Sequence, residues 1–125
     1  MGSLLSIDVD QLQQESDRWK KKLELLLLEN AVLKNRLAEV VNASHATVPF
    51  LETAEEYQNR FMQKDDIINL MRQDITEFDK LLAQSLHHNK DMMRAIVQRQ
   101  RRLRKELSLL ESTFKNLKGQ FNQLL

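Results

Sequence analysis

The sequence contains no cysteine, one proline and two glycines among its 125 residues. Without cysteine the chain has no disulfides, no thiol nucleophile and no thiolate metal ligands, and this absence favours a reducing compartment. No apolar run reaches the roughly 18 residues that a membrane-spanning helix needs. We therefore expect a cytoplasmic protein with no membrane span.

Aromatic residues are also few, at 6%, and no charge sign dominates. Nineteen lysines and arginines stand against eighteen aspartates and glutamates, so the formal net charge is +1. A chain with so little net charge has no overall field that attracts nucleic acid or an anionic membrane, and any such binding requires a local patch. The 30% of charged residues, together with little glycine and proline, is typical of long helices.

Motifs that carry enzymatic chemistry are missing. The sequence has no glycine-rich phosphate loop, no G-x-S-x-G and no H-E-x-x-H. Its three histidines, His45, His87 and His88, are too few to hold a metal without further ligands. We therefore predict no enzymatic activity, no catalytic, cofactor or metal site, and no small-molecule substrate.

Apolar residues recur every three and four positions in three stretches of the chain. These seams run from Val9 to Val40, from Ala54 to Ser85 and from Met93 to Leu124. The only proline, Pro49, separates the first two stretches, because proline disfavours helix at the residue before it. The pattern predicts a single domain, 1–125, with helices at about 7–42, 51–86 and 89–124.

Two all-α architectures fit this pattern. Leu82 and Met93 are equivalent seam positions eleven residues apart, a spacing that either a turn near His87 to Asn89 or a continuous helix with a stutter can accommodate. With the turn, three helices of about 35 residues match at about 50 Å, which favours three long antiparallel helices in an up-down-up, coiled-coil-like bundle. The alternative is a helical hairpin whose long second helix dimerises.

The helices contain more leucine and isoleucine than one seam can use. In a three-helix bundle this surplus is expected to contact the third helix. The surplus positions are Leu25, Leu27, Leu28, Ile67, Leu70, Leu81 and Leu86.

The stretches "EYQNRFMQKDDIINLMRQDITEFDKLL" and "QRQRRLRKELSLLESTFKNLKGQFNQLL" resemble the helices of small, uncharacterised all-helical proteins found in bacteria. The resemblance covers most of the chain from Glu52 and consists mainly of seam positions and charges. It implies a helical bundle in a bacterial cytoplasm, and it implies no activity.

Polar residues interrupt the seams at a few positions. Folding the first two helices antiparallel about residues 46 and 47 places Asn30 opposite Lys64, and Glu111 of the third helix falls at about the same level. A single polar layer can fix the register of packed helices at some cost in stability. We therefore predict a polar core layer of Asn30, Lys64 and Glu111.

The third helix begins with a strongly basic segment, "RAIVQRQRRLRKEL". We name four of its residues, on the side away from the seam, the basic stripe: Arg94, Arg101, Arg102 and Lys105. Acids of the other two helices are expected to neutralise this stripe, because the bundle brings them beside it: Asp8, Asp10, Glu15, Asp17, Asp74, Glu77 and Asp79.

The expected neutralisation of the basic stripe favours protein binding over nucleic-acid binding. We predict a non-enzymatic interaction or scaffold module that binds a protein partner or self-associates through its helix faces. The alternative is binding of nucleic acid or another polyanion through the basic stripe.

Overall fold

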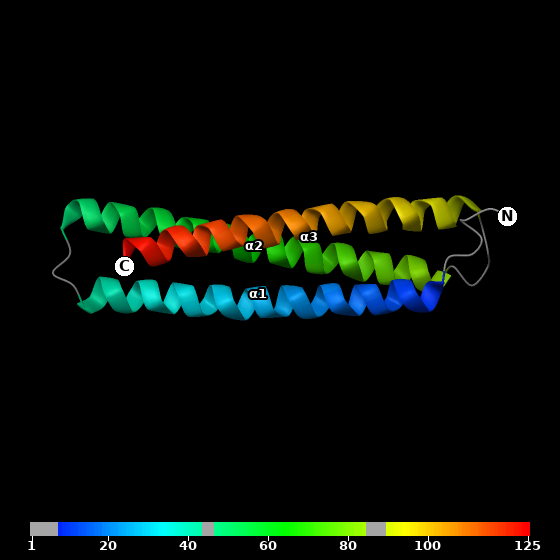
Figure 1. Cartoon of the computed structure of the whole chain (residues 1–125), viewed down its shortest axis with the longest axis horizontal. Coiled ribbons are helices and arrows are strands. Elements are labelled where there is room, and N and C mark those ends of the chain that lie inside the picture. Colours follow the sequence, from blue (N-terminus) through cyan, green and yellow to red (C-terminus); the bar gives the residue numbers. More distant parts are fainter. Residues whose placement is uncertain (1–7, 44–46, 85–89) are drawn as a thin grey trace.

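The computed structural model describes residues 8–43, 47–84 and 90–125. These residues form three long helices: α1 (Val9–Ala43), α2 (Val48–Gln84) and α3 (Lys90–Leu124). Figure 1 shows the helices side by side along one axis, with α2 running against α1 and α3 running against α2. The described chain is therefore the all-α, up-down-up bundle that the sequence predicts.

Capping residues mark where the first two helices begin. The carboxylate of Asp8 accepts hydrogen bonds from the backbone N–H groups of Asp10, at 2.9 Å, and Gln11, at 3.4 Å. The Thr47 hydroxyl likewise accepts one from the N–H of Phe50, at 3.3 Å. Helix α2 thus begins three residues before the predicted residue 51. Pro49 does not prevent this start, because the first turn of a helix does not use its own N–H groups.

Helix α3 folds back onto α2 and does not continue it. Lys64 Nζ donates a hydrogen bond to the Thr113 hydroxyl at 2.8 Å, and Arg60 donates one to Gln120 at 2.7 Å. An earlier residue of α2 thus contacts a later residue of α3, as antiparallel packing requires. The alternative of one long second helix is therefore wrong. The predicted cap of the third helix, Asn89, lies outside the described residues.

The core follows the predicted seams in two clusters. The larger cluster fills the half of the bundle that holds Trp19 and Phe78, whose ring centroids are 5.3 Å apart. The smaller cluster lies toward the α1–α2 connection, where the rings of Phe61 and Phe121 meet edge to face at 5.1 Å. Burying these apolar side chains supplies the main driving force for folding.

The expected role of the surplus leucines is wrong for Leu25 and Leu28, which are exposed on α1. Leu27 and Leu81 are partly buried against the larger cluster, and Leu86 lies outside the described residues. Because successive helical residues turn by about 100°, one step along a helix is enough to change a core-facing position into a solvent-facing one. Ile67 and Leu70 are also exposed, but both border α3 along a groove between α2 and α3.

Candidate functional site

The predicted polar layer is centred on Asn30, which is fully buried. Its Nδ2 donates hydrogen bonds to the Phe61 carbonyl oxygen, at 2.8 Å, and to the Asp65 carboxylate, at 2.7 Å. These acceptors precede and follow Lys64 on α2, so Asn30 lies at the level of Lys64. Lys34 Nζ is 2.5 Å from the other carboxylate oxygen of Asp65. The chemistry of this layer is therefore a buried amide and a lysine that share one carboxylate.

Lys64 and Glu111 do not join that network. Lys64 is half-buried and binds Thr113 on α3, and its burial lowers the pKa of its ammonium group, as does the nearby charge of Arg60. Glu111 is exposed, and its carboxylate lies 3.7 Å from Lys22 of α1. The predicted contact between Lys64 and Glu111 is thus absent: Lys64 contacts α3 at Thr113 instead, and Glu111 contacts α1 at Lys22.

A second polar contact repeats the first along the bundle. Ser16 is fully buried, and its hydroxyl donates a hydrogen bond to the Asp79 carboxylate at 2.6 Å. Lys20, four residues after Ser16, lies 2.5 Å from the other oxygen of Asp79. The sequence signal for both contacts is a polar seam residue followed four positions later by lysine. Sequence reasoning noted the polar seam residues but missed their aspartate partners.

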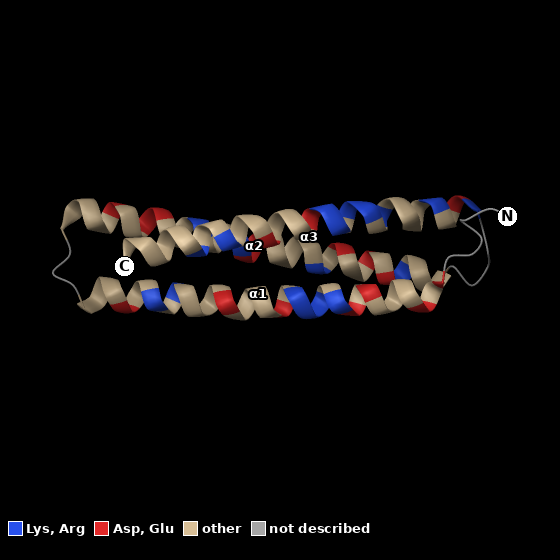
Figure 2. Ribbon diagram, viewed as in Figure 1, with Lys and Arg blue, Asp and Glu red and all other residues tan. Residues whose placement is uncertain are grey.

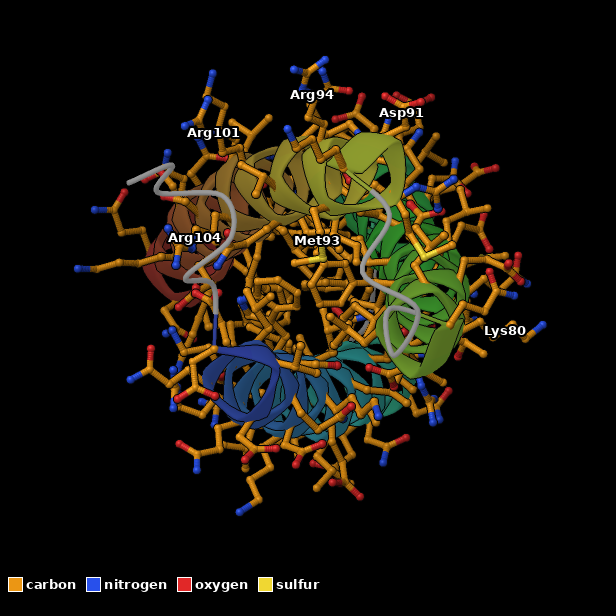
Figure 3. All side chains as sticks on the ribbon, turned by 90° about the vertical axis from the view of Figure 1, so that its right-hand side faces the viewer. Lys80, Asp91, Met93, Arg94, Arg101 and Arg104 are labelled. Atoms are coloured by element: carbon orange, nitrogen blue, oxygen red, sulfur yellow. The ribbon has the colours of Figure 1, made fainter. Side chains whose placement is uncertain are left out.

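The basic stripe is exposed along the outside of α3. Figure 2 shows lysines and arginines gathered in the first half of this helix. In Figure 3, Arg94 and Arg101 extend away from the bundle, whereas Met93 points into it. Arg102 lies 4.0 Å from Glu106 in the same helix. Across the three described ranges, no carboxylate forms an ion pair with Arg94, Arg101 or Lys105.

Three of the acids that were expected to neutralise the basic stripe contact lysines instead. Asp17 and Asp79 both contact Lys20, and Glu77 contacts Lys80. Within the described residues, no acid of another helix contacts the basic stripe, so the expected neutralisation does not occur in the structure.

Arg104, which lies outside the basic stripe, does pair across helices. Its guanidinium group donates two hydrogen bonds to the Glu15 carboxylate, at 2.7 and 3.0 Å, and Gln100 donates a third at 2.7 Å. Burial alone would raise the pKa of Glu15, but these hydrogen bonds and the charges of Arg104 and Arg18 lower that pKa below its ordinary value. The result is a hydrogen-bonded ion pair between α1 and α3.

An apolar groove of about 440 Å³ runs along the outside of the bundle between α2 and α3. Three large apolar side chains in it are exposed: Ile67 by 39%, Leu70 by 60% and Leu109 by 65%. The remaining lining residues are Lys64, Met71, Asp74, Glu106, Leu110 and Thr113. We call this the α2–α3 groove. Its apolar centre and mixed charges make it a candidate binding surface for a helix.

A larger hollow, of about 680 Å³, lies between the end of α1 and the start of α2. Its lining mixes charged, amide and apolar side chains: Lys34, Leu37, Ala38, Val41, Asn42, Leu51, Ala54, Glu55, Gln58 and Met62. Because its lining mixes polar and apolar groups, it suits an apolar helix less well than the α2–α3 groove does.

A second set of exposed apolar side chains lies on the outside of α1. Leu25, Leu28 and Val32 are 65%, 60% and 63% exposed. Their spacing of three and four residues places them on one face of the helix, opposite its core seam. We call this set the outer α1 stripe.

Comparison of the chain with known protein families, with curated proteins and with solved structures finds no match. The architecture of a small all-helical protein therefore rests on the structure, and these comparisons do not support a bacterial origin. Among the described residues, no helix is both long and apolar enough to cross a membrane. The same residues contain no group of three or more histidines, aspartates or glutamates placed to hold a metal. The three histidines lie outside the described ranges.

Proposed function

We propose that this protein is a non-enzymatic helical interaction module whose α2–α3 groove binds a helix of a partner protein. The supporting observation is that Ile67, Leu70 and Leu109 expose their side chains around one groove. Contiguous exposed apolar patches mark interaction sites, and a groove between two helices suits an amphipathic helix with apolar anchors every three and four residues.

The chemistry of the groove defines the partner. Full burial of one large aliphatic side chain is worth about 1.5–3 kcal/mol, so a few leucine-sized anchors are enough for a specific contact. Lys64 toward one end of the groove and Asp74 and Glu106 toward the other give the rim both charge signs. The partner helix is therefore expected to carry an apolar stripe flanked by both acidic and basic residues.

Site-specific photo-crosslinking in cells tests this proposal. A photoreactive amino acid at Leu70 is expected to form a covalent adduct with the partner. Asn69 is exposed on α2 but does not line the groove, so the photoreactive amino acid placed there is expected to form much less of this adduct. The double variant Leu70→Gln, Leu109→Gln should lose the partner in co-purification while it keeps its helix content. Equal adducts from Leu70 and Asn69 would contradict the proposal.

Binding of a polyanion is the second candidate function. The observation that favours it is the lack of ion pairs at Arg94, Arg101 and Lys105 among the described residues, since unpaired cations remain available for phosphates. Residues 90–106 contain no aromatic side chain on which a base could stack, so this binding would be electrostatic alone.

We also propose a cytoplasmic setting. The absence of cysteine supports it, because extracellular domains of this size commonly use disulfides. A bacterial origin rests only on the resemblance of the second and third helices.

A further inference from the structure

The outer α1 stripe is the centre of a longer pattern on the same face of α1. Continuing its spacing in both directions adds Arg18 and Lys21 before Leu25, and Asn35 and Glu39 after Val32. All four added residues are exposed. One end of this face is thus basic and its centre is apolar, and its other end carries the acid Glu39 beside the exposed Arg36.

Within the described residues the charges of this face form no ion pair, although the charge of Arg18 acts on Glu15 from a distance. Lys20 and Lys22, which flank Lys21, pair with acids of α2 and α3, and Glu29 pairs with Lys118 of α3. In contrast, Arg18, Lys21 and Glu39 belong to no ion pair within the described residues. The inward charges of α1 are therefore already neutralised, whereas its outer face keeps both charge signs unpaired.

We propose that the outer face of α1 binds a second copy of this chain, with the two α1 helices antiparallel. In that orientation one register places Lys21 opposite Glu39 of the second copy and Leu28 opposite its Val32. Two-fold symmetry forms each of these contacts twice. A parallel pair would instead place Lys21 against Lys21 and Glu39 against Glu39, and facing like charges disfavour that arrangement.

The size of this face sets the strength of the association. From Arg18 to Glu39 the helix is about 32 Å long, at a rise of about 1.5 Å per residue. One helix face of this length buries less than the roughly 1,200–2,000 Å² of a stable interface, so we expect a reversible dimer with a dissociation constant in the micromolar range. The α2–α3 groove remains open in this dimer, and the inference does not rest on its partner.

Sedimentation equilibrium over a range of protein concentrations tests the dimer. The parent chain is expected to pass from monomer to dimer, and Leu28→Glu is expected to remain a monomer. Lys21→Glu and Glu39→Lys should each weaken self-association by about tenfold, since each change replaces two favourable pairs by two repulsive ones. The double variant Lys21→Glu, Glu39→Lys should recover the affinity of the parent.

Two controls accompany these variants. Circular dichroism should show unchanged helix content, because every changed residue is exposed. The groove variant Leu70→Gln, Leu109→Gln should dimerise like the parent, which separates this inference from the proposed function. A parent chain that stays monomeric up to about 1 mM would overturn the proposal. So would a dimer that Leu28→Glu leaves intact.

Cysteine cross-linking determines the orientation, and the absence of native cysteine makes every introduced thiol unique. With a short bismaleimide linker, Lys21→Cys mixed with Glu39→Cys is expected to give a covalent dimer. Each variant alone should give little. Cross-linking of Lys21→Cys with itself would show a parallel pair and would contradict the antiparallel arrangement.

Discussion

Asp65 and Asp79 lie two heptads apart on α2, and each binds one buried polar side chain and one lysine of α1. The buried partners, Asn30 and Ser16, are also two heptads apart. Sliding α2 by one heptad would remove both aspartates from their partners and leave buried polar groups without hydrogen bonds. The two contacts therefore fix the register of α1 against α2.

The first prediction concerns the aspartate that binds Asn30. Asp65→Ala is expected to lower the free energy of unfolding by about 1–3 kcal/mol, because the buried Asn30 amide loses an acceptor. Urea unfolding followed by circular dichroism measures the change. Asp66→Ala, one position along and exposed, is the matched control and should cost less than about 0.5 kcal/mol. Equal losses for the two variants would show that the Asn30 contact contributes nothing to stability.

The helices and their register could be predicted from the sequence because both follow from the spacing of apolar residues. The predicted first and third helices end within two residues of the observed bounds, and Asn30 lies at the predicted level of Lys64. Helix α2 begins earlier than predicted, because Thr47 caps a helix start before Pro49 that the proline alone disfavours.

The neighbours of the flanking side chains could not be predicted in the same way. Spacing gives the level of a residue along the bundle, but it does not say on which side of the α1–α2 pair the third helix lies. Glu111 therefore has the predicted level near Lys64 but faces Lys22 of α1. The same uncertainty explains why Arg104 pairs with Glu15 while Arg101 points to solvent.

The second prediction concerns Lys64, whose charge is partly removed from water. Lys64→Leu is expected to raise the free energy of unfolding at neutral pH by about 1 kcal/mol, because the variant no longer places a charge in a half-buried site. The Thr113 hydroxyl keeps its hydrogen bond to the Leu110 carbonyl oxygen.

The pH dependence provides the check. The native-state pKa of Lys64 lies below its ordinary value of 10.5, so the unfolded chain holds this proton more tightly. The penalty is present at neutral pH and falls as the pH rises through the native-state pKa. Thermal unfolding of both proteins should therefore show a gain from Lys64→Leu that shrinks at alkaline pH. A loss of stability at neutral pH would contradict this prediction.

The third prediction concerns the pair between Glu15 and Arg104. Glu15→Gln is expected to cost about 0.5–1 kcal/mol at pH 7, a modest value because Arg104 is largely exposed. The native-state pKa of Glu15 is lowered, so its contribution is fully present above the ordinary value of 4.5 and is lost as the pH falls through the native-state pKa. Chemical unfolding across acid pH should show the two proteins converging. Glu24→Gln, at an exposed position of α1, is the control and should change the stability at pH 7 by less than about 0.5 kcal/mol.

The last prediction separates the two candidate functions through the basic stripe. A protein that neutralises phosphates releases their counterions, so its affinity falls steeply with salt, and each lost contact lowers the slope by about one. We expect labelled DNA and RNA to bind weakly at low salt and not measurably at physiological salt, as fluorescence anisotropy would show. Changing all four residues of the basic stripe to glutamine should remove the low-salt binding and leave stability within about 0.5 kcal/mol, because no cross-helix contact is lost.

A second four-fold variant removes the same charge from lysines that the bundle already pairs: Lys20, Lys22, Lys34 and Lys118. Changing these four lysines to glutamine should lower stability. It should weaken binding at low salt less than the changes in the basic stripe do. If both variants lose binding equally, net charge alone attracts the polyanion and the basic stripe is not a site. Micromolar binding at physiological salt that only the stripe variant loses would make polyanion binding, in place of helix binding, the primary function, because unpaired cations would then act at the salt concentration of the cell.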